Sequence, residues 1–135
     1  MARTMTTTQP ARTKIYIVDD EDSIRRALGR LMRSAGLDCE SYATGEEFLS
    51  HLPAGAQGCL VLDIRMPELT GHDVMTRLRN REVDIPVIAL SAQDDTTTRE
   101  RARELGAVAF FRKPVDDQAL LDAILWAMDR RVREA

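Results

Sequence analysis

Apolar stretches of two kinds alternate along the chain. Short continuous runs typical of buried strands lie at 14–18, 39–42, 59–63, 86–91 and 107–111. Apolar residues recur at helical spacing in the segments 24–35, 44–52, 72–80, 95–105 and from 116 onward. Regular alternation of strands and helices is typical of a parallel sheet with helices on both faces. We therefore predict an α/β protein with a doubly wound, five-stranded parallel sheet in the order 2-1-3-4-5.

Two of the predicted helices have informative details. Thr44 and Glu47 have the spacing of a capping box at the start of the second helix. The fourth helix, at about 95–105, has only a thin apolar stripe of Thr98, Ala102 and Leu105. A helix with so little apolar surface to bury is expected to be weakly packed and able to move.

Length and composition fit one globular domain. The chain has 135 residues, of which 44% are hydrophobic and 30% charged, and its net charge is -3. Residues 1–14 contain only basic charges, so the rest of the chain is acidic, and a domain of that sign would not attract DNA through its general field. We expect a disordered leader over 1–13 and one folded domain over 14–133.

The sequence also bears on the compartment. No apolar run approaches membrane-spanning length, so no contact with a membrane is expected. Cys39 and Cys59 are too few, and too apolar in context, to form a disulfide framework. These features favour a reducing cytoplasm.

Polar residues gather where the predicted strands end. Asp19 and Asp20 follow the first strand, Asp63 ends the third, Ser91 ends the fourth and Lys113 follows the fifth. In a sheet of this order, ligands bind at the carboxyl ends of the strands, beside the switch point between strands one and three. The sequence therefore predicts a site at this edge.

The residue types at this edge indicate a metal and a phosphate. Three carboxylates close together repel one another, and a divalent cation relieves the repulsion. Oxygen ligands alone favour Mg²⁺, whereas Zn²⁺ would require His or Cys, and neither His51 nor His72 lies at a strand end. Lys113 and Ser91 supply an ammonium group and a hydroxyl suited to phosphoryl oxygens. Asp63, at the centre, is the predicted nucleophile that would form an aspartyl phosphate.

Four motifs together resemble one family. VDDED, LDIRMPELTG, ALSA and FFRKP, in this order and spacing, are similar to the receiver domain of two-component response regulators, which has the CheY-like, flavodoxin-like fold. The resemblance covers about residues 14–130. The FLS that follows ATGEE, together with the DIRMP loop, is closest to the FixJ type, whose members usually carry a C-terminal helix-turn-helix domain that binds DNA.

The resemblance implies a role for each acidic residue. Asp63 matches the phosphoacceptor and Asp20 the direct Mg²⁺ ligand of the acidic pair. Asp19 matches the acid that acts on the metal largely through water. The backbone carbonyl of Arg65 matches a further Mg²⁺ contact.

The resemblance also implies a switch. Lys113 matches the lysine that pairs with the acidic cluster and then with the phosphoryl group, before a peptide bond to Pro114 that is usually cis. Ser91 takes the position of the switch hydroxyl, where Thr is commoner. Phe110 takes the aromatic switch position often held by Tyr, and without a phenol it cannot donate a hydrogen bond there.

The function implied is signalling rather than turnover. A sensor histidine kinase, or a small acyl phosphate, would transfer a phosphoryl group to Asp63, and the surface formed by the fourth helix, fifth strand and fifth helix would then change. That surface would control a homodimer or an effector. Transcription would be regulated only through a DNA-binding domain that is expected to be absent from this chain.

Three other interpretations remain open at this stage. A Mg²⁺-dependent phosphohydrolase also uses an aspartyl nucleophile but typically needs an acid two residues later. Asp63 has Arg65 at that position, and Asp19 has Glu21, which is an imperfect substitute. A flavodoxin-like cofactor binder should have a phosphate loop rich in Gly, Ser and Thr, where this chain has DDED. A degenerate receiver that serves only as a scaffold should lack a key residue, and none is missing here.

Overall fold

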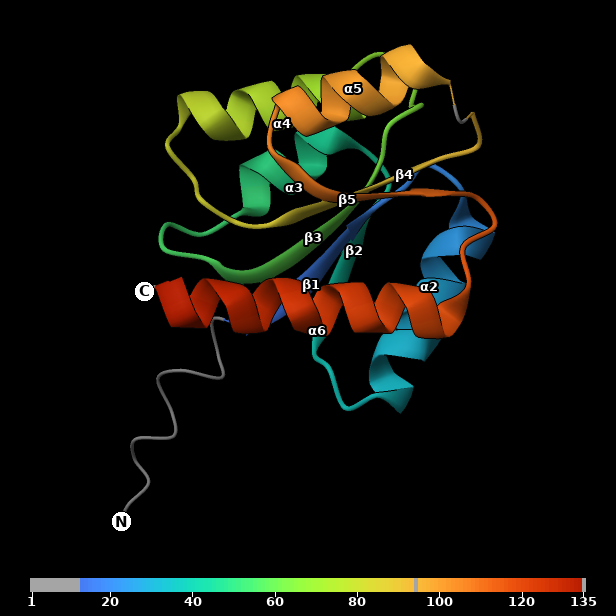
Figure 1. Ribbon diagram of the computed structural model, residues 1–135, viewed down its shortest axis with the longest axis vertical. Helices are drawn as coiled ribbons and strands as arrows, with labels where there is room; N and C mark the ends of the chain where they lie inside the picture. Colours follow the sequence, from blue (N-terminus) through green and yellow to red (C-terminus); the bar gives the residue numbers. More distant parts are fainter. Residues whose placement is uncertain (1–12, 94, 135) are drawn as a thin grey trace.

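Five parallel strands form one sheet in the predicted order. The computed structural model of the chain describes residues 13–93 and 95–134, with side chains as far as residue 129. The strands are paired in the order β2-β1-β3-β4-β5, so β2 and β5 are the edges (Figure 1). Their bounds are β1 (Thr13–Val18), β2 (Cys39–Tyr42), β3 (Gln57–Asp63), β4 (Val87–Ser91) and β5 (Ala107–Arg112).

Helices cover both faces of the sheet, as predicted. They are α2 (Asp22–Ser34), α3 (Gly45–His51), α4 (Gly71–Asn80), α5 (Thr96–Glu104) and α6 (Asp117–Glu134). Helices α2 and α6 pack on one face, and α3, α4 and α5 lie on the other (Figure 1). Of the predicted disordered leader, residues 1–12 lie outside the described residues, whereas Thr13 belongs to β1.

The central strands are buried on both faces, which explains their continuous apolar sequence. Leu60 and Leu62 contribute to the core under α3 and α4, whereas Cys59 and Val61 contribute to the core under α2 and α6. All four side chains are at most 1% exposed. Successive residues of β3 thus fill opposite cores, so the strand is fixed in register from both sides.

The start of β4 and the capping of α3 differ in detail from the prediction. Pro86, expected as the first residue of the fourth strand, lies just before β4, where its carbonyl accepts a hydrogen bond from Leu60 N–H at 2.9 Å. Thr44 does cap α3 by accepting from Glu47 N–H, but the Glu47 carboxylate accepts from Ala43 N–H and not from Thr44. The complete capping box is at α4, which the sequence analysis did not identify.

Helix α5 is as thinly packed as its sequence predicts. Only Thr98 and Ala102 of its residues are buried. The Ala102 side chain packs with Ile64 and Ala89, beside the partly buried ring of Phe110. The helix therefore rests on a contact of small side chains above β4 and β5.

The two cysteines lie on strands that flank β1. Ile15 is paired with Cys39 of β2 on one side and with Cys59 of β3 on the other. Both thiols are free, and a strand separates them, which excludes a disulfide without movement of the backbone. Within the described part of the chain, no helix is long and apolar enough to cross a membrane.

Candidate functional site

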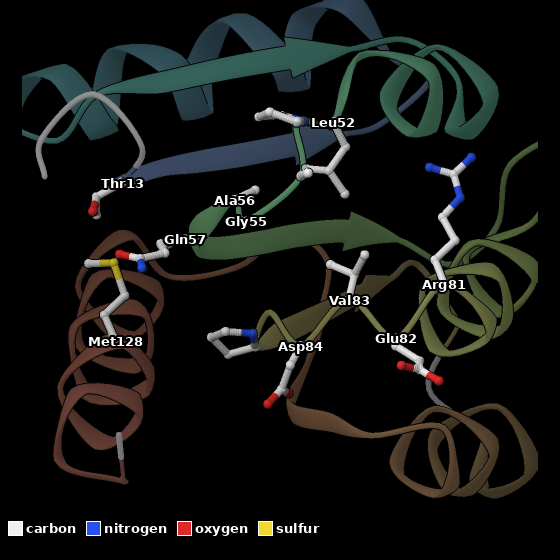
Figure 2. A pocket seen from close by; sticks show the side chains of 14 residues that line it. Thr13, Leu52, Gly55, Ala56, Gln57, Arg81, Glu82, Val83, Asp84 and Met128 are labelled. Atoms are coloured by element: carbon white, nitrogen blue, oxygen red, sulfur yellow. The ribbon is translucent and has the colours of Figure 1, made fainter. Parts of the chain in front are cut away.

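A cleft of about 740 Å³ opens at the amino ends of the strands (Figure 2). Its lining includes the apolar residues Leu52, Val83 and Pro86 together with polar residues such as Gln57 and Asp84. None of the polar strand-end residues singled out in the sequence is among the described residues that line it. Those residues lie at the carboxyl ends of the strands, which are therefore the candidate functional site.

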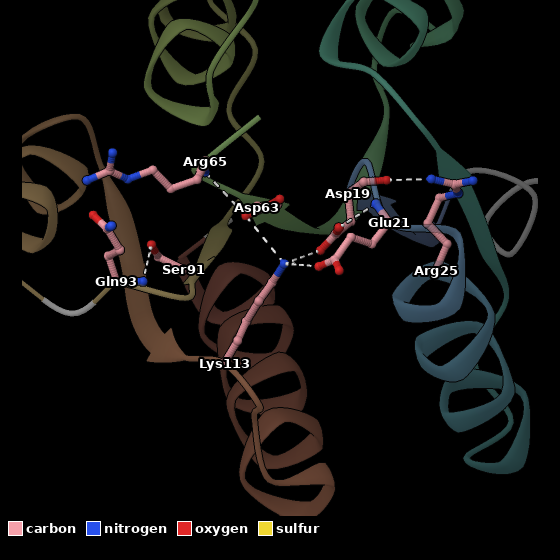
Figure 3. Close-up of polar contacts among 8 residues, drawn as sticks. All are labelled: Asp19, Glu21, Arg25, Asp63, Arg65, Ser91, Gln93 and Lys113. Carbon is pink, nitrogen blue, oxygen red and sulfur yellow. Dashed lines mark hydrogen bonds and ion pairs between the residues drawn. The ribbon is translucent and has the colours of Figure 1, made fainter. Parts of the chain in front are cut away.

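At the carboxyl edge, the predicted residues converge. Asp19 directly follows β1, Asp63 ends β3, Ser91 ends β4 and Lys113 directly follows β5. Figure 3 shows the Lys113 side chain extending across this edge toward Asp63 and Asp19. Four segments that are far apart in the sequence thus deliver one ammonium group, one hydroxyl and the acidic groups to a single site.

Gly71 lets the loop after β3 stay close to the site. Its N–H donates to the carbonyl of Ile64 at 2.9 Å, which fastens the start of α4 to the end of β3. A Cβ at this position would lie 2.6 Å from the backbone oxygen of Asp63. Only glycine therefore permits this close approach of two backbones.

Three carboxylates form the acidic centre of the site. One oxygen from each of Asp19, Asp20 and Asp63 can be chosen so that all three lie within 4.8 Å of one another. Asp19 and Asp63 are buried, at 1% and 3% exposure, whereas Asp20 is exposed. Two negative charges with little access to water, and a third beside them, require a cationic partner.

Lys113 supplies part of that charge. Its Nζ lies 2.9 Å from Asp19 Oδ2, 3.4 Å from Glu21 Oε1 and 3.5 Å from Asp63 Oδ1. Burial opposes its positive charge, but the close contact with the Asp19 carboxylate and the charge of Asp63 outweigh burial and raise the pKa of Lys113 above its usual value. The peptide bond that follows, to Pro114, is cis, as the family resemblance implies.

Asp63 does not ionise easily in this environment. Burial raises the pKa of Asp63 to about 7, and the neighbouring Asp19 carboxylate reinforces the shift, although Lys113 acts against it. The N–H of Arg65 donates to Asp63 Oδ1 at 3.2 Å and also stabilises the anion. One lysine therefore compensates this acidic group only in part.

The residues present fit a magnesium ion. The donors are carboxylate oxygens, which Mg²⁺ prefers, with no His or Cys among them. Asp19 Oδ2 is buried and has no hydrogen-bond partner among the described residues, and its contact with Lys113 is an ion pair alone. A divalent cation at this site would satisfy that oxygen and lower the cost of the clustered negative charge.

Ser91 and Phe110 lie on the neighbouring strands β4 and β5, where Phe110 is paired with Ala89, two residues before Ser91. Ser91 is fully buried, and its Oγ accepts from Gln93 N–H at 3.1 Å. Phe110 is partly buried, with the guanidinium of Arg99 on α5 5.5 Å from its ring centre. The side chain of β5 expected to switch thus already contacts the helix expected to move.

Three contributions to the site were missed by the sequence analysis. Arg25 of α2 donates to the backbone oxygen of Asp19 at 2.7 Å, and Glu21 both contacts Lys113 and donates its N–H to Asp19 Oδ1 at 2.9 Å. The guanidinium of Arg65 contacts Asp95 and Thr98 near the start of α5. The only signal in the sequence for these contacts was the DDED motif at the start of a helix. It did not indicate that Arg25, six residues after Asp19, would reach the site.

Comparisons with known proteins agree with this geometry. A family model described as the response regulator receiver domain matches residues 15–125. The response regulator protein TodT of Pseudomonas putida is 41% identical over 114 residues, which cover 84% of this chain and 50% of that protein. The chain belongs to the response regulator receiver domain family.

Solved structures place it in the same family. The structure of the response regulator StyR matches with a TM-score of 0.83 and 37% identity, over 91% of this chain and 65% of that one. The crystal structure of FixJ-N matches with a TM-score of 0.81 and 31% identity, over 87% of this chain and 94% of that one. The chain spans about half the length of the curated relatives it matches.

The family also decides between the classes of function. Receiver domains are phosphoacceptors of two-component systems and not a family of catalytic enzymes, and the relatives of this chain include transcriptional regulatory proteins. The phosphohydrolase interpretation has no support in the structure either. The residue two positions after Asp63 is Arg65, and its side chain is directed to α5.

Proposed function

We propose that this chain is a phosphorylation-controlled switch of a two-component system in the cytoplasm, which receives a phosphoryl group from a sensor histidine kinase or from a small acyl phosphate. The observation that carries the proposal is the position of Asp63. It is 3% exposed, ends a central strand and lies 3.5 Å from the ammonium group of Lys113. A buried carboxylate that is costly to ionise and faces a lysine at a strand end is typical of a functional site.

The transfer is a displacement at phosphorus. An oxygen of the Asp63 carboxylate forms the new P–O bond, and the P–N bond of the kinase phosphohistidine breaks, with its electron pair remaining on the imidazole nitrogen. Lys113 neutralises charge on the transferred group, and the Ser91 hydroxyl donates a hydrogen bond to one of its oxygens. Asp63 thereby acts as the acceptor, and each chain takes up one phosphoryl group and does not turn over a substrate.

Mg²⁺ would be held by Asp20 and Asp63 directly, by Asp19 largely through water and by the backbone carbonyl of Arg65. The ion supplies positive charge to the phosphoryl oxygens. Asp19 also keeps Lys113 in place through the 2.9 Å contact between them. The acidic pair thus has two functions, binding of the metal and positioning of the lysine.

The switch would pass through Ser91 and Phe110 to the surface of α5, β5 and α6. Movement of Ser91 toward the phosphoryl group opens space beside the Phe110 ring. Because Phe110 packs against the cluster that contains Ala102 and lies under Arg99, an inward rotation of the ring removes part of the support of α5. A thinly packed helix is then free to adopt a second position.

This surface is suited to a homodimer. Arg103 on α5 and Arg112 on β5 are exposed cations, and Asp117 and Asp122 on α6 are exposed acids. A two-fold axis brings the cations of one copy to the acids of the other. Dimerisation would then control transcription through a C-terminal DNA-binding domain outside this chain, a role supported by the transcriptional regulatory proteins among its relatives.

The first experiment is chemical labelling. Acetyl phosphate with Mg²⁺ should give one hydroxylamine-labile phosphate per chain, and Asp63→Asn should take up none. Chelation of the metal should also abolish the label. Steady release of phosphate over many turnovers, or an unchanged label on Asp63→Asn, would contradict the proposal.

A further inference from the structure

Arg65 contacts both the candidate phosphoacceptor and the start of α5. Its backbone N–H donates to Asp63 Oδ1 at 3.2 Å. Its guanidinium Nη2 lies 3.6 Å from Asp95 Oδ2 and donates to Thr98 Oγ1 at 3.4 Å. Figure 3 shows this side chain extending away from Asp63. One residue thus joins the two parts of the molecule between which a signal has to pass.

Asp95 is already engaged in holding α5 together. It is the N-cap residue, and its Oδ1 accepts from Thr98 N–H at 2.7 Å. Its second oxygen faces Arg65. The guanidinium therefore contacts the carboxylate that caps the helix and the first buried residue of that helix.

The strength of this contact suits a reversible switch. The side chains of Arg65 and Asp95 are 53% and 50% exposed, so their ion pair changes an equilibrium by only about two- to fivefold. Only Thr98 and Ala102 of α5 are buried. A weak contact at one end is therefore a large share of what positions this helix.

We infer that Arg65 is a positioning residue that holds the start of α5 while Asp63 is unmodified, and that a phosphoryl group on Asp63 competes with Asp95 for its guanidinium. The inference rests on the proposed function. A phosphoryl group adds close to two negative charges and three acceptor oxygens beside the Arg65 backbone. A planar guanidinium binds a phosphoryl group through two N–H donors at once. That interaction is stronger than the half-exposed ion pair with Asp95. When Arg65 turns to the phosphoryl group, α5 loses its contact with the loop after β3.

Two substitutions separate this role from a merely structural one. Asp95→Asn removes the competing charge but keeps a good N-cap, so α5 remains folded. Arg65→Gln removes the guanidinium but leaves the backbone N–H on Asp63. Glu100→Gln, which removes an exposed acid elsewhere on α5, is the matched control.

Hydrogen exchange over residues 96–104 and titration with beryllofluoride in Mg²⁺ give the two readouts. Both Asp95→Asn and Arg65→Gln should raise exchange of α5 about two- to fivefold without beryllofluoride. Their effects on half-saturation should have opposite signs. Asp95→Asn should bind beryllofluoride about two- to fivefold more tightly, because Asp95 no longer competes for the guanidinium of Arg65. Arg65→Gln should bind it more weakly. The double variant should bind like Arg65→Gln.

The outcomes are distinguishable. If both substitutions shift half-saturation in the same direction, or if Asp95→Asn behaves like Glu100→Gln, the inference is wrong. Labelling with acetyl phosphate separates that failure from failure of the proposed function. A wild-type chain that is labelled on Asp63 while the variants match the control refutes the inference alone, whereas a wild-type chain that takes no label refutes both.

Discussion

Asp63 combines two requirements that oppose each other. A nucleophile must be ionised, yet burial and the Asp19 carboxylate raise the pKa of this group to about 7. The protonated form is thus favoured in the folded chain at pH values where an unfolded chain is already ionised. Stability should consequently fall as the pH rises from about 4 to about 7.

Asp63→Asn removes this cost, because an amide has no proton to lose. Without metal, we expect the variant to be more stable than wild type by about 4 kcal/mol at pH 8 and by little at pH 4. Urea unfolding in the presence of a chelator measures both values. Addition of Mg²⁺ should stabilise only the wild type appreciably, and equal stabilisation of the two chains would show that Asp63 is not part of the metal site.

Gly71 gives a second prediction at the scale of the residue. In Gly71→Ala the new methyl group would lie 2.6 Å from the backbone oxygen of Asp63, so α4 or the end of β3 must shift. We expect a loss of about 2 kcal/mol in the free energy of unfolding and a slower uptake of label by Asp63. Gly36→Ala is not a neutral comparison because its φ is +76°; Gly29→Ala on α2, where only the Arg33 side chain is near, is the better control.

Among the elements, α5 should be the least protected helix. It buries two residues, whereas α4 buries Gly71, Val74, Met75 and Leu78. Amide hydrogens of α5 should exchange faster than those of α4 by tenfold or more, a factor of about 10 for every 1.4 kcal/mol of lower local stability. Mass spectrometry of peptides from the two helices tests this, and equal protection would remove the physical reason for placing the switch at α5.

How well elements were predicted depends on what determines them. The strand order follows from alternation and from the chirality of crossovers, which act over the whole chain. Strand ends were also reliable, because Asp63 and Ser91 each close a run of apolar residues. The direction of long side chains could not be predicted, because the guanidiniums of Arg25 and Arg65 are placed by contacts with other segments. The capping box of Thr70 and Asp73 was overlooked although its spacing is visible in the sequence.

At the scale of the whole molecule, activation should change the state of association. We expect beryllofluoride with Mg²⁺ to convert the wild-type chain from monomer to dimer, as measured by light scattering. Arg103→Glu should weaken that dimer about tenfold while leaving the label on Asp63 unchanged, because it places a like charge opposite α6 of the second copy. Trp126, which is 51% exposed on α6, should report dimerisation and not Mg²⁺ binding.

The position of Cys59 has a practical consequence. Its thiol is 0% exposed in the central strand β3, and burial raises its pKa to about 12, so neither a reagent nor a base reaches it in the closed molecule. A thiol reagent can modify this side chain only when β3 separates from its neighbours. The rate of modification of Cys59 therefore reports how often the sheet opens at β3. The more accessible Cys39 serves as an internal reference that reacts first.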